Sequence, residues 1–362
     1  MKSTVFTAKA FAFVLLAGAL GITQSTAFTQ SSATTLETAL KTSLERGADI
    51  ATSVQSLLSA RADLQVKQSD PTTLVVSLTQ AQQTVALETA RLSAKRIEVM
   101  GNVTTAYMNL YEAQENLKVL NAQVALDTRN LEVAKAKLSQ KNGTELDVRK
   151  AESTLSTSKQ NLVNQKAQLP TLSNKLEVLL GAELKGDITV ADPPAYKEVK
   201  VESAALEKAL ETRLPTMVQA VQGVELQTLN VKLADNDYTP ANTLADAKAN
   251  LLTAQRTLDT TRKNAVTSLR DAVRSVGSAL ETVKLNTTSL QNERDGLKQD
   301  QQRFKNGSIT RVQLQQSELS VLQAEYKLTQ SQDTYFKALT SLSSASGVDV
   351  TGMLEKIGGA AS

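Results

Sequence analysis

The side chains that most often carry out chemistry in proteins are rare in this sequence. It contains no histidine and no cysteine, so the commonest general base, the commonest metal ligand and the thiol nucleophile are all missing. The glycine-spaced segment 181–186, GAELKG, lacks the pattern of a phosphate-binding loop, and we find no nucleophile elbow. We therefore expect neither an enzyme nor a bound cofactor or metal.

The remaining chemical candidates are carboxylates in segments with a helical pattern, namely Glu37, Glu45, Glu112, Glu115 and Asp147. Paired carboxylates can act as general acid and base, but only when the fold brings them together. A charged residue on a helix is far more often part of a solvated face. We interpret all five as surface charges.

The charge balance and the aromatic content argue against nucleic acid as a partner. The full chain has a net charge of +3, and residues 1–27 contain two lysines and no acidic residue. A nucleic-acid binder needs a clustered basic face, and single strands also need aromatic stacking platforms. Only 3% of the residues are aromatic, and none is tryptophan. The composition instead suits long helices that bury narrow stripes.

The first residues predict export from the cytoplasm. Lys2 and Lys9 form a basic region, residues 10–22 are apolar, and Ser25 and Ala27 offer the small residues of a cleavage site. The alternative is a membrane anchor, but the apolar run is short for a span of about 20 residues. We expect a signal peptide over 1–27 and a mature protein in the cell envelope.

An internal duplication decides the domain organisation. The segment LETALKTSLERGADI at 36–50 is echoed by LEKALETRLPTMVQA at 206–220, and Lys-Asn-Gly at 141–143 recurs at 305–307. We therefore predict a first repeat over 28–181, a linker over 182–203, a second repeat over 204–348 and a flexible tail over 349–362. In the linker, Pro193 and Pro194 favour extended backbone, and the ITV and KEVKV segments could each form a short strand.

Each repeat has apolar residues at alternating steps of three and four. In the first repeat these positions are Val103, Ala106, Leu110, Ala113, Leu117, Leu120, Val124, Asp127, Leu131, Ala134 and Leu138, all apolar except the aspartate. A seam with a period of 3.5 residues is typical of a left-handed coiled coil. An ordinary amphipathic bundle would show the same spacing, so the seam alone leaves both alternatives open.

Helix length favours the coiled coil. From about Thr73 to Gln140 only Gly101 weakens the helical pattern, and such a helix would be about 100 Å long. We predict an all-α protein with two long helical hairpins, which turn where Gly143 and Gly307 supply a positive φ. Pro170 should kink the first returning helix without ending it.

The turn and the returning helix of each repeat resemble the TolC family of outer-membrane efflux proteins. The likeness is carried by RFKNGSIT at 303–310 with the helix that follows, and by KNGTELDVRKAESTLSTSKQNL from 141. It covers nearly all of the mature chain. The resemblance implies a homotrimeric tunnel, a TolC-like α-barrel of helices in the periplasm of a diderm bacterium, associated with the outer membrane.

The resemblance also implies partners and sites. The tunnel would dock a periplasmic adaptor and an inner-membrane pump through its tips, which are Asn142, Gly143, Thr144, Asn306, Gly307 and Ser308. The alternative is that these residues serve only as turns. Asp147, Gln313 and Gln316 stand where the family can place acidic residues at the tunnel aperture. Only Asp147 keeps a carboxylate, so charge is not expected to close this tunnel.

One departure from the family concerns the outer membrane. In the family each repeat inserts a β-hairpin of a membrane barrel between its first and second helices, and such a hairpin needs at least about 22 residues. Here only 68–72 and about 235–243 separate the helical patterns. We expect the barrel hairpins to be missing and any outer-membrane attachment to come from a partner. Two functions therefore stay open: an export conduit, or a barrel-less periplasmic scaffold without transport activity.

Overall fold

The computed structural model describes residues 33–181, 188–194, 198–199 and 202–357. The predicted signal peptide lies outside these residues. In the described part of the chain nine α-helices follow one another: α1 (Leu36–Arg46), α2 (Ala48–Ser69), α3 (Val75–Ser139), α4 (Glu145–Leu180), α5 (Ser203–Arg213), α6 (Pro215–Ala234), α7 (Ala241–Lys305), α8 (Arg311–Ser346) and α9 (Met353–Ile357). The all-α prediction is confirmed.

The duplication reappears as helices of matching length. Helices α3 and α7 have 65 residues each, α4 and α8 have 36 each, and α1 and α5 have 11 each. A helix of 65 residues is about 100 Å long. The predicted rod-like helices are therefore present in both repeats, and α4 runs through Pro170 without a break, as expected.

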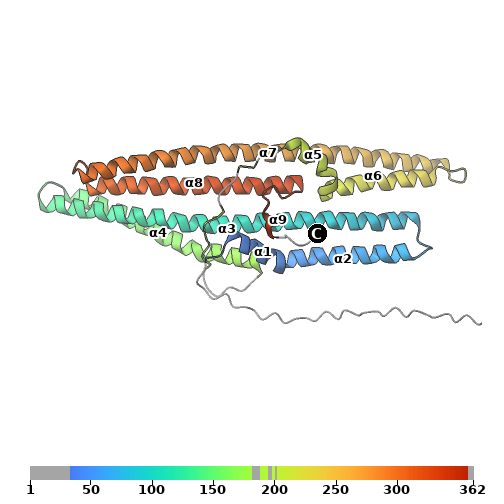
Figure 1. Cartoon of the computed structure of the whole chain (residues 1–362), viewed down its shortest axis with the longest axis horizontal. Helices are drawn as coiled ribbons and strands as arrows, with labels where there is room; N and C mark the ends of the chain where they lie inside the picture. The colour runs from blue at the N-terminus through green and yellow to red at the C-terminus, as the bar shows by residue number, and fades with distance from the viewer. Residues whose placement is uncertain (1–32, 182–187, 195–197, 200–201, 358–362) are drawn as a thin grey trace, which may run out of the picture.

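The two repeats lie against each other along the length of the rod (Figure 1). Helix α3 packs against α4 towards one end of the rod and against α2 towards the other, and α7 packs against α8 and α6 in the same way. The α3–α4 and α7–α8 turns therefore share one end of the rod. The short connections 70–74 and 235–240 share the opposite end. Contacts of α3 with α8 and α6 join the repeats.

The predicted seams are largely buried. In the first repeat no seam position from Val103 to Leu138 is exposed, and Asp127, the polar member, is only 4% exposed. Its carboxylate accepts hydrogen bonds from the Ser158 hydroxyl and from Gln123 Nε2. In the second repeat the same spacing runs along α7 from Val266 to Leu297. There Leu269, Val276 and Val283 are buried, whereas the polar positions Thr287 and Arg294 are exposed.

Each repeat has its own apolar core beside its first short helix. The first core gathers side chains of α1, α3 and the end of α4, and the second gathers side chains of α5, α7 and α8. The returning helix of each repeat ends at a glycine with positive φ, Gly181 (61°) or Gly347 (69°). Gly181 abuts Arg46 at the end of α1, and Gly347 abuts Arg213 at the end of α5. In both repeats the end of the returning helix thus packs against the end of the first helix.

Two buried tyrosines hold the segments that precede and join the repeats. The Tyr107 hydroxyl lies 2.9 Å from the carbonyl oxygen of Thr34 and 2.7 Å from that of Ala191. The Tyr335 hydroxyl accepts a hydrogen bond from the Val199 amide at 3.1 Å. Of the two strands expected in the linker, the described residues contain a single parallel bridge between Thr34 and Val190. Most of KEVKV lies outside the described residues.

The C-terminal segment returns to the first repeat. Helix α9 places Met353, Leu354 and Ile357 against the apolar core of the first repeat. Asp349 fixes the start of this segment, because its Oδ2 accepts a hydrogen bond from the Leu354 amide at 2.6 Å. The described part of the tail, 349–357, therefore contains a short helix packed on the first repeat, where the sequence predicted a flexible segment.

Candidate functional site

The turn between α3 and α4 occupies residues 140–144. Lys141 has a φ of 60°, and the Asn142 amide donates to the Lys137 carbonyl oxygen at 2.8 Å. This six-to-one hydrogen bond after a residue of positive φ is the Schellman motif of a helix C-terminus. The prediction that Gly143 supplies the positive φ is wrong, because the residue that must turn is fixed by its distance from the helix end.

The turn between α7 and α8 occupies residues 306–310 and has the same hydrogen bonds. Gly307 has the predicted positive φ, of 70°, and the Ser308 amide donates to the Arg303 carbonyl oxygen at 2.8 Å. Lys141 and Gly307 are therefore structural equivalents, with an offset of 166, whereas the two Asn-Gly pairs are 164 apart. The repeated Asn-Gly pair is out of register by two residues.

The proposed aperture residues form part of the caps of the returning helices. Asp147 accepts hydrogen bonds from the Thr144 amide at 3.0 Å and the Thr144 hydroxyl at 2.8 Å, and Gln313 accepts the same pair from Thr310. Each threonine in turn caps the backbone of its partner, which completes a capping box. The hydrogen bonds from Thr144 lower the pKa of Asp147. Gln316 is exposed and lies outside the cap.

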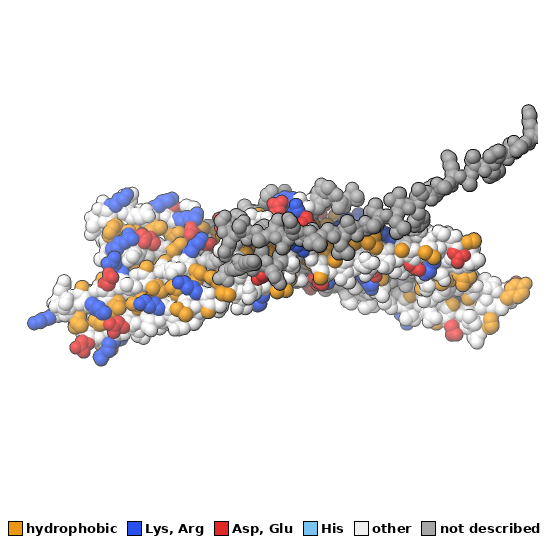
Figure 2. Space-filling model, turned by 90° about the horizontal axis from the view of Figure 1, so that it is seen from below, with side chains coloured by type: hydrophobic (Ala, Val, Ile, Leu, Met, Phe, Trp, Pro, Cys, Tyr) orange, Lys and Arg blue, Asp and Glu red, His pale blue; other side chains and the backbone are white. Residues whose placement is uncertain are grey.

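The tip end of the rod is exposed and rich in basic side chains, which Figure 2 shows at the left. Several of these cations have no carboxylate within ion-pair distance among the described residues, namely Lys137, Lys141, Arg149, Lys150 and Lys305. Gly307 is fully open, since a Cβ added there would meet nothing within 4 Å, whereas one at Gly143 would lie 3.0 Å from Lys137 Cβ. The second turn therefore offers the more accessible backbone.

Two long grooves lie along the sides of the rod. One, of about 850 Å³, runs between α6 and α7 and is lined only by uncharged side chains, among them Ala220, Gly223, Thr257 and Thr261. The other, of about 670 Å³, runs between α3 and α4 beside Thr105 and Leu179. Small uncharged side chains let another backbone approach closely. The groove between α6 and α7 therefore leaves room for a neighbouring helix.

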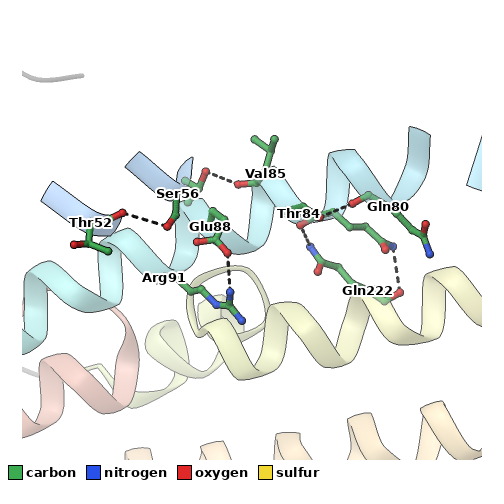
Figure 3. A network of polar contacts seen from close by, with 10 residues as sticks. Thr52, Ser56, Gln80, Thr84, Val85, Glu88, Arg91 and Gln222 are labelled. Atoms are coloured by element: carbon green, nitrogen blue, oxygen red, sulfur yellow. Dashed lines mark hydrogen bonds and ion pairs between the residues drawn. The ribbon is translucent and has the colours of Figure 1, made fainter. Parts of the chain in front are cut away.

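The contact between α3 and α6 joins the repeats through side-chain amides. Gln83 Nε2 donates to the Gln222 carbonyl oxygen at 3.1 Å, and Gln222 Nε2 donates back to the Gln83 carbonyl oxygen at 2.7 Å. Figure 3 shows Gln222 of α6 beneath α3, next to Gln80 and Thr84. The exchange ties the two backbones together, and Gln83 Nε2 also donates to Glu225 Oε2 of α6 at 3.3 Å.

The contact between α3 and α8 contains a partly buried ion pair within α8. Asp333 of α8 is 3% exposed, and its Oδ2 accepts a hydrogen bond from Lys337 Nζ at 2.5 Å. The same ammonium group reaches across to Asn109 Oδ1 of α3 at 3.0 Å. Lys337 therefore links a buried carboxylate of one repeat to an amide of the other.

Glu112 of α3 also belongs to this contact. It is half-buried against Asp333, and burial raises the pKa of Glu112 to about 8, helped by its hydrogen bond with Asp333 and by that residue's charge. The interpretation of Glu112 as a solvated surface charge is therefore wrong. Among the other four carboxylates, Glu37, Glu45 and Asp147 are exposed and Glu115 pairs with Lys118 at 2.6 Å.

Comparisons with known proteins agree with this architecture. No family model and no curated protein sequence matches the chain. Among solved structures, the CmeC outer membrane channel of Campylobacter jejuni matches with a TM-score of 0.64 and 13% identity, over 98% of this chain and 97% of that one. The chain has the fold of the TolC-family outer-membrane channels.

Two further TolC-like structures support the match. The outer-membrane channel OprN has a TM-score of 0.64 and 16% identity, over 86% of this chain and 89% of that chain. The outer membrane protein VceC of Vibrio cholerae has a TM-score of 0.59 and 14% identity, over 86% and 96%. No helix in the described residues is long and apolar enough to cross a membrane.

Within the TolC-like fold, sequence reasoning missed the contact of Asp333 and Lys337 of α8 with α3. The signal is a second face on α8: Asp333, Phe336, Lys337 and Thr340 follow the spacing of one helical face, and all but the lysine are buried. The apolar seam of α8, which includes Leu328, Tyr335 and Leu342, follows the other face, which packs against α7. Hydrophobic periodicity did not reveal the second face, because Phe336 is the only apolar residue of the four.

Proposed function

We propose that the protein is a subunit of a trimeric export conduit in the cell envelope. The observation that carries this proposal is the TolC-like pair of long hairpins, with both turns at one end of the rod. In such an assembly three copies place their helices side by side around a tunnel. The tips then point towards a periplasmic adaptor and an inner-membrane pump, and the opposite end lies towards the outer membrane.

The grooves support association between copies. Helices with seams of period 3.5 bury one face within their hairpin and leave another for a partner. The groove of the second repeat is uncharged and lined largely by small side chains. A helix of a neighbouring copy could therefore approach it closely without burying a charge. Multi-angle light scattering of the mature chain should show a trimer. A stable, fully helical monomer at micromolar concentration would exclude the tunnel.

The tips support docking of an adaptor. The open backbone at Gly307 and the unpaired cations of the two turns, Lys305 beside Gly307 among them, form an accessible end surface. Replacement of Gly307 by valine adds a β-branched side chain at a positive φ, which distorts the turn while α7 and α8 remain. We expect a photo-cross-linker at Ser308 to give an adaptor adduct in the cell envelope, and Gly307→Val to abolish that adduct.

A matched control separates docking from folding. Gly277 lies within α7, where an added Cβ also meets nothing within 4 Å, so Gly277→Val should leave the adduct at Ser308 intact. An unchanged adduct in a well-folded Gly307→Val protein would reduce the Asn-Gly pair to a turn without a docking role.

The alternative function is a periplasmic scaffold that keeps the helical rod and transports nothing. Short connections favour it: only residues 70–74 join α2 to α3, and only 235–240 join α6 to α7. We expect the purified mature chain to open no pores alone in planar bilayers, and any outer-membrane attachment to come from a partner. Reproducible conductance from the purified chain would refute that expectation. Loss of export on deletion would favour the conduit over the scaffold.

A further inference from the structure

The contact between α3 and α8 contains a buried carboxylate oxygen that lacks a hydrogen-bond donor in the described part of the chain. Oδ1 of Asp333 is enclosed by protein and receives no hydrogen bond from an amide, hydroxyl or ammonium group of the described residues. An acceptor buried without a donor is costly. The neighbouring group is the carboxyl of Glu112, which lies one helical turn after Asn109 on α3 and close enough to Asp333 for a hydrogen bond between the two carboxyl groups. Two carboxyl groups can form such a bond only when one of them holds a proton.

Little positive charge faces the two carboxyl groups. The charged groups that act on Glu112 are Asp333 and Lys337, both on α8. Tyr326, on the same helix, also lies near Glu112: burial raises the pKa of its phenol, and the charge of Glu112 adds to that rise. From α4, the side chain at this level is the uncharged amide of Gln165, which bonds to Asn116 at 3.2 Å. One ammonium group therefore faces two carboxyl groups.

We infer that Glu112 and Asp333 form a proton-binding site that joins the two repeats. With the proton bound, the carboxyl of Glu112 donates to Asp333 Oδ1 while Lys337 donates to Oδ2, and α3 and α8 are held together by both bonds. Without it, two negative charges face each other in a partly buried contact, which weakens the packing of one repeat against the other. The inference concerns the protomer alone and does not depend on transport.

The direction of the pH effect follows from the raised pKa of Glu112. The folded chain holds this proton up to about pH 8, whereas an ordinary glutamate in the unfolded chain releases it near 4.5. Between these values the folded state binds more protons than the unfolded state, so the free energy of unfolding falls as the pH rises. The stabilisation is complete below about 4.5 and is lost as the pH approaches 8.

Urea denaturation of the mature chain from about pH 5 to about pH 9 tests the site, at one fixed protein concentration. Glu112→Gln keeps a donor for Asp333 but cannot titrate. The quantity to follow is the unfolding constant of the wild type divided by that of Glu112→Gln. We expect this ratio to rise with pH by up to about tenfold per pH unit, because the release of one proton on unfolding allows no steeper change. The ratio should level off above about pH 8.

A matched variant and a direct titration make the test decisive. Glu132 lies on the same helix, has a side chain that is 56% exposed and pairs with Arg129, so the corresponding ratio for Glu132→Gln should not change over this range. A constant ratio for Glu112→Gln would overturn the inference. If that variant does not fold, carboxyl NMR of the wild-type chain labelled at glutamate decides: one glutamate should titrate near pH 8, and the absence of such a signal refutes the site.

Discussion

The turn after α3 and the turn after α7 have the same five-residue length and the same hydrogen bonds, but they place different residues at the position of positive φ. The first uses Lys141 and the second uses Gly307. A lysine with positive φ is strained, whereas a glycine is not. The geometry of a helical hairpin is therefore set by the lengths of its helices and by its caps. The Asn-Gly pair is repeated in the sequence, but its two copies do not occupy equivalent positions in the two turns.

The largest expected effect compares two glycines that share a backbone conformation but not their surroundings. Gly347 has a φ of 69°, and an added Cβ would lie 3.0 Å from Arg213 Cβ, whereas the open Gly307 has a φ of 70°. Gly347→Ala should lower the free energy of unfolding by about 2–4 kcal/mol, and Gly307→Ala by about 1–2 kcal/mol. Urea denaturation measures both. Equal losses would mean that the close packing of Gly347 against Arg213 at the end of α5 adds nothing to stability.

An exchange of residues between the turns sharpens the comparison. Lys141→Gly should raise the free energy of unfolding by about 1 kcal/mol because it removes the strain of a positive φ, less the entropy that glycine adds to the unfolded chain. Gly307→Lys should lower it by a similar amount. Opposite signs in chemical denaturation would establish that the two positions are equivalent. A loss of stability in both variants would contradict the assigned register.

The smallest effect distinguishes the two capping boxes by their response to acid. Asp147 in the first box has a lowered pKa, so its contribution is present above the ordinary aspartate pKa of 3.8 and is lost as the pH falls through the lower folded value. Gln313 cannot titrate. Hydrogen exchange should therefore show the start of α4 opening more in acid than the start of α8. Asp147→Asn should abolish that difference, and a difference that persists would assign it to another group.

Much of the helical architecture could be predicted from local sequence features. The expected helix from Thr73 to Gln140 corresponds to α3 from Val75 to Ser139, because breakers and apolar spacing act along a single segment. The register of the first turn could not be predicted, since the sequence repeats Asn-Gly while the hydrogen bonds count from the helix end. The Glu112 contact was also missed, because it depends on how one repeat lies against the other.

The packing of α9 on the first repeat adds a connection between the two halves of the chain. The segment after the second repeat packs on the core of the first, while Lys337 and Gln222 hold the two repeats together elsewhere. The linker is thus not the sole connection between the halves. A protease that cuts within 182–203 would leave two fragments that remain associated and migrate as one particle until a denaturant separates them.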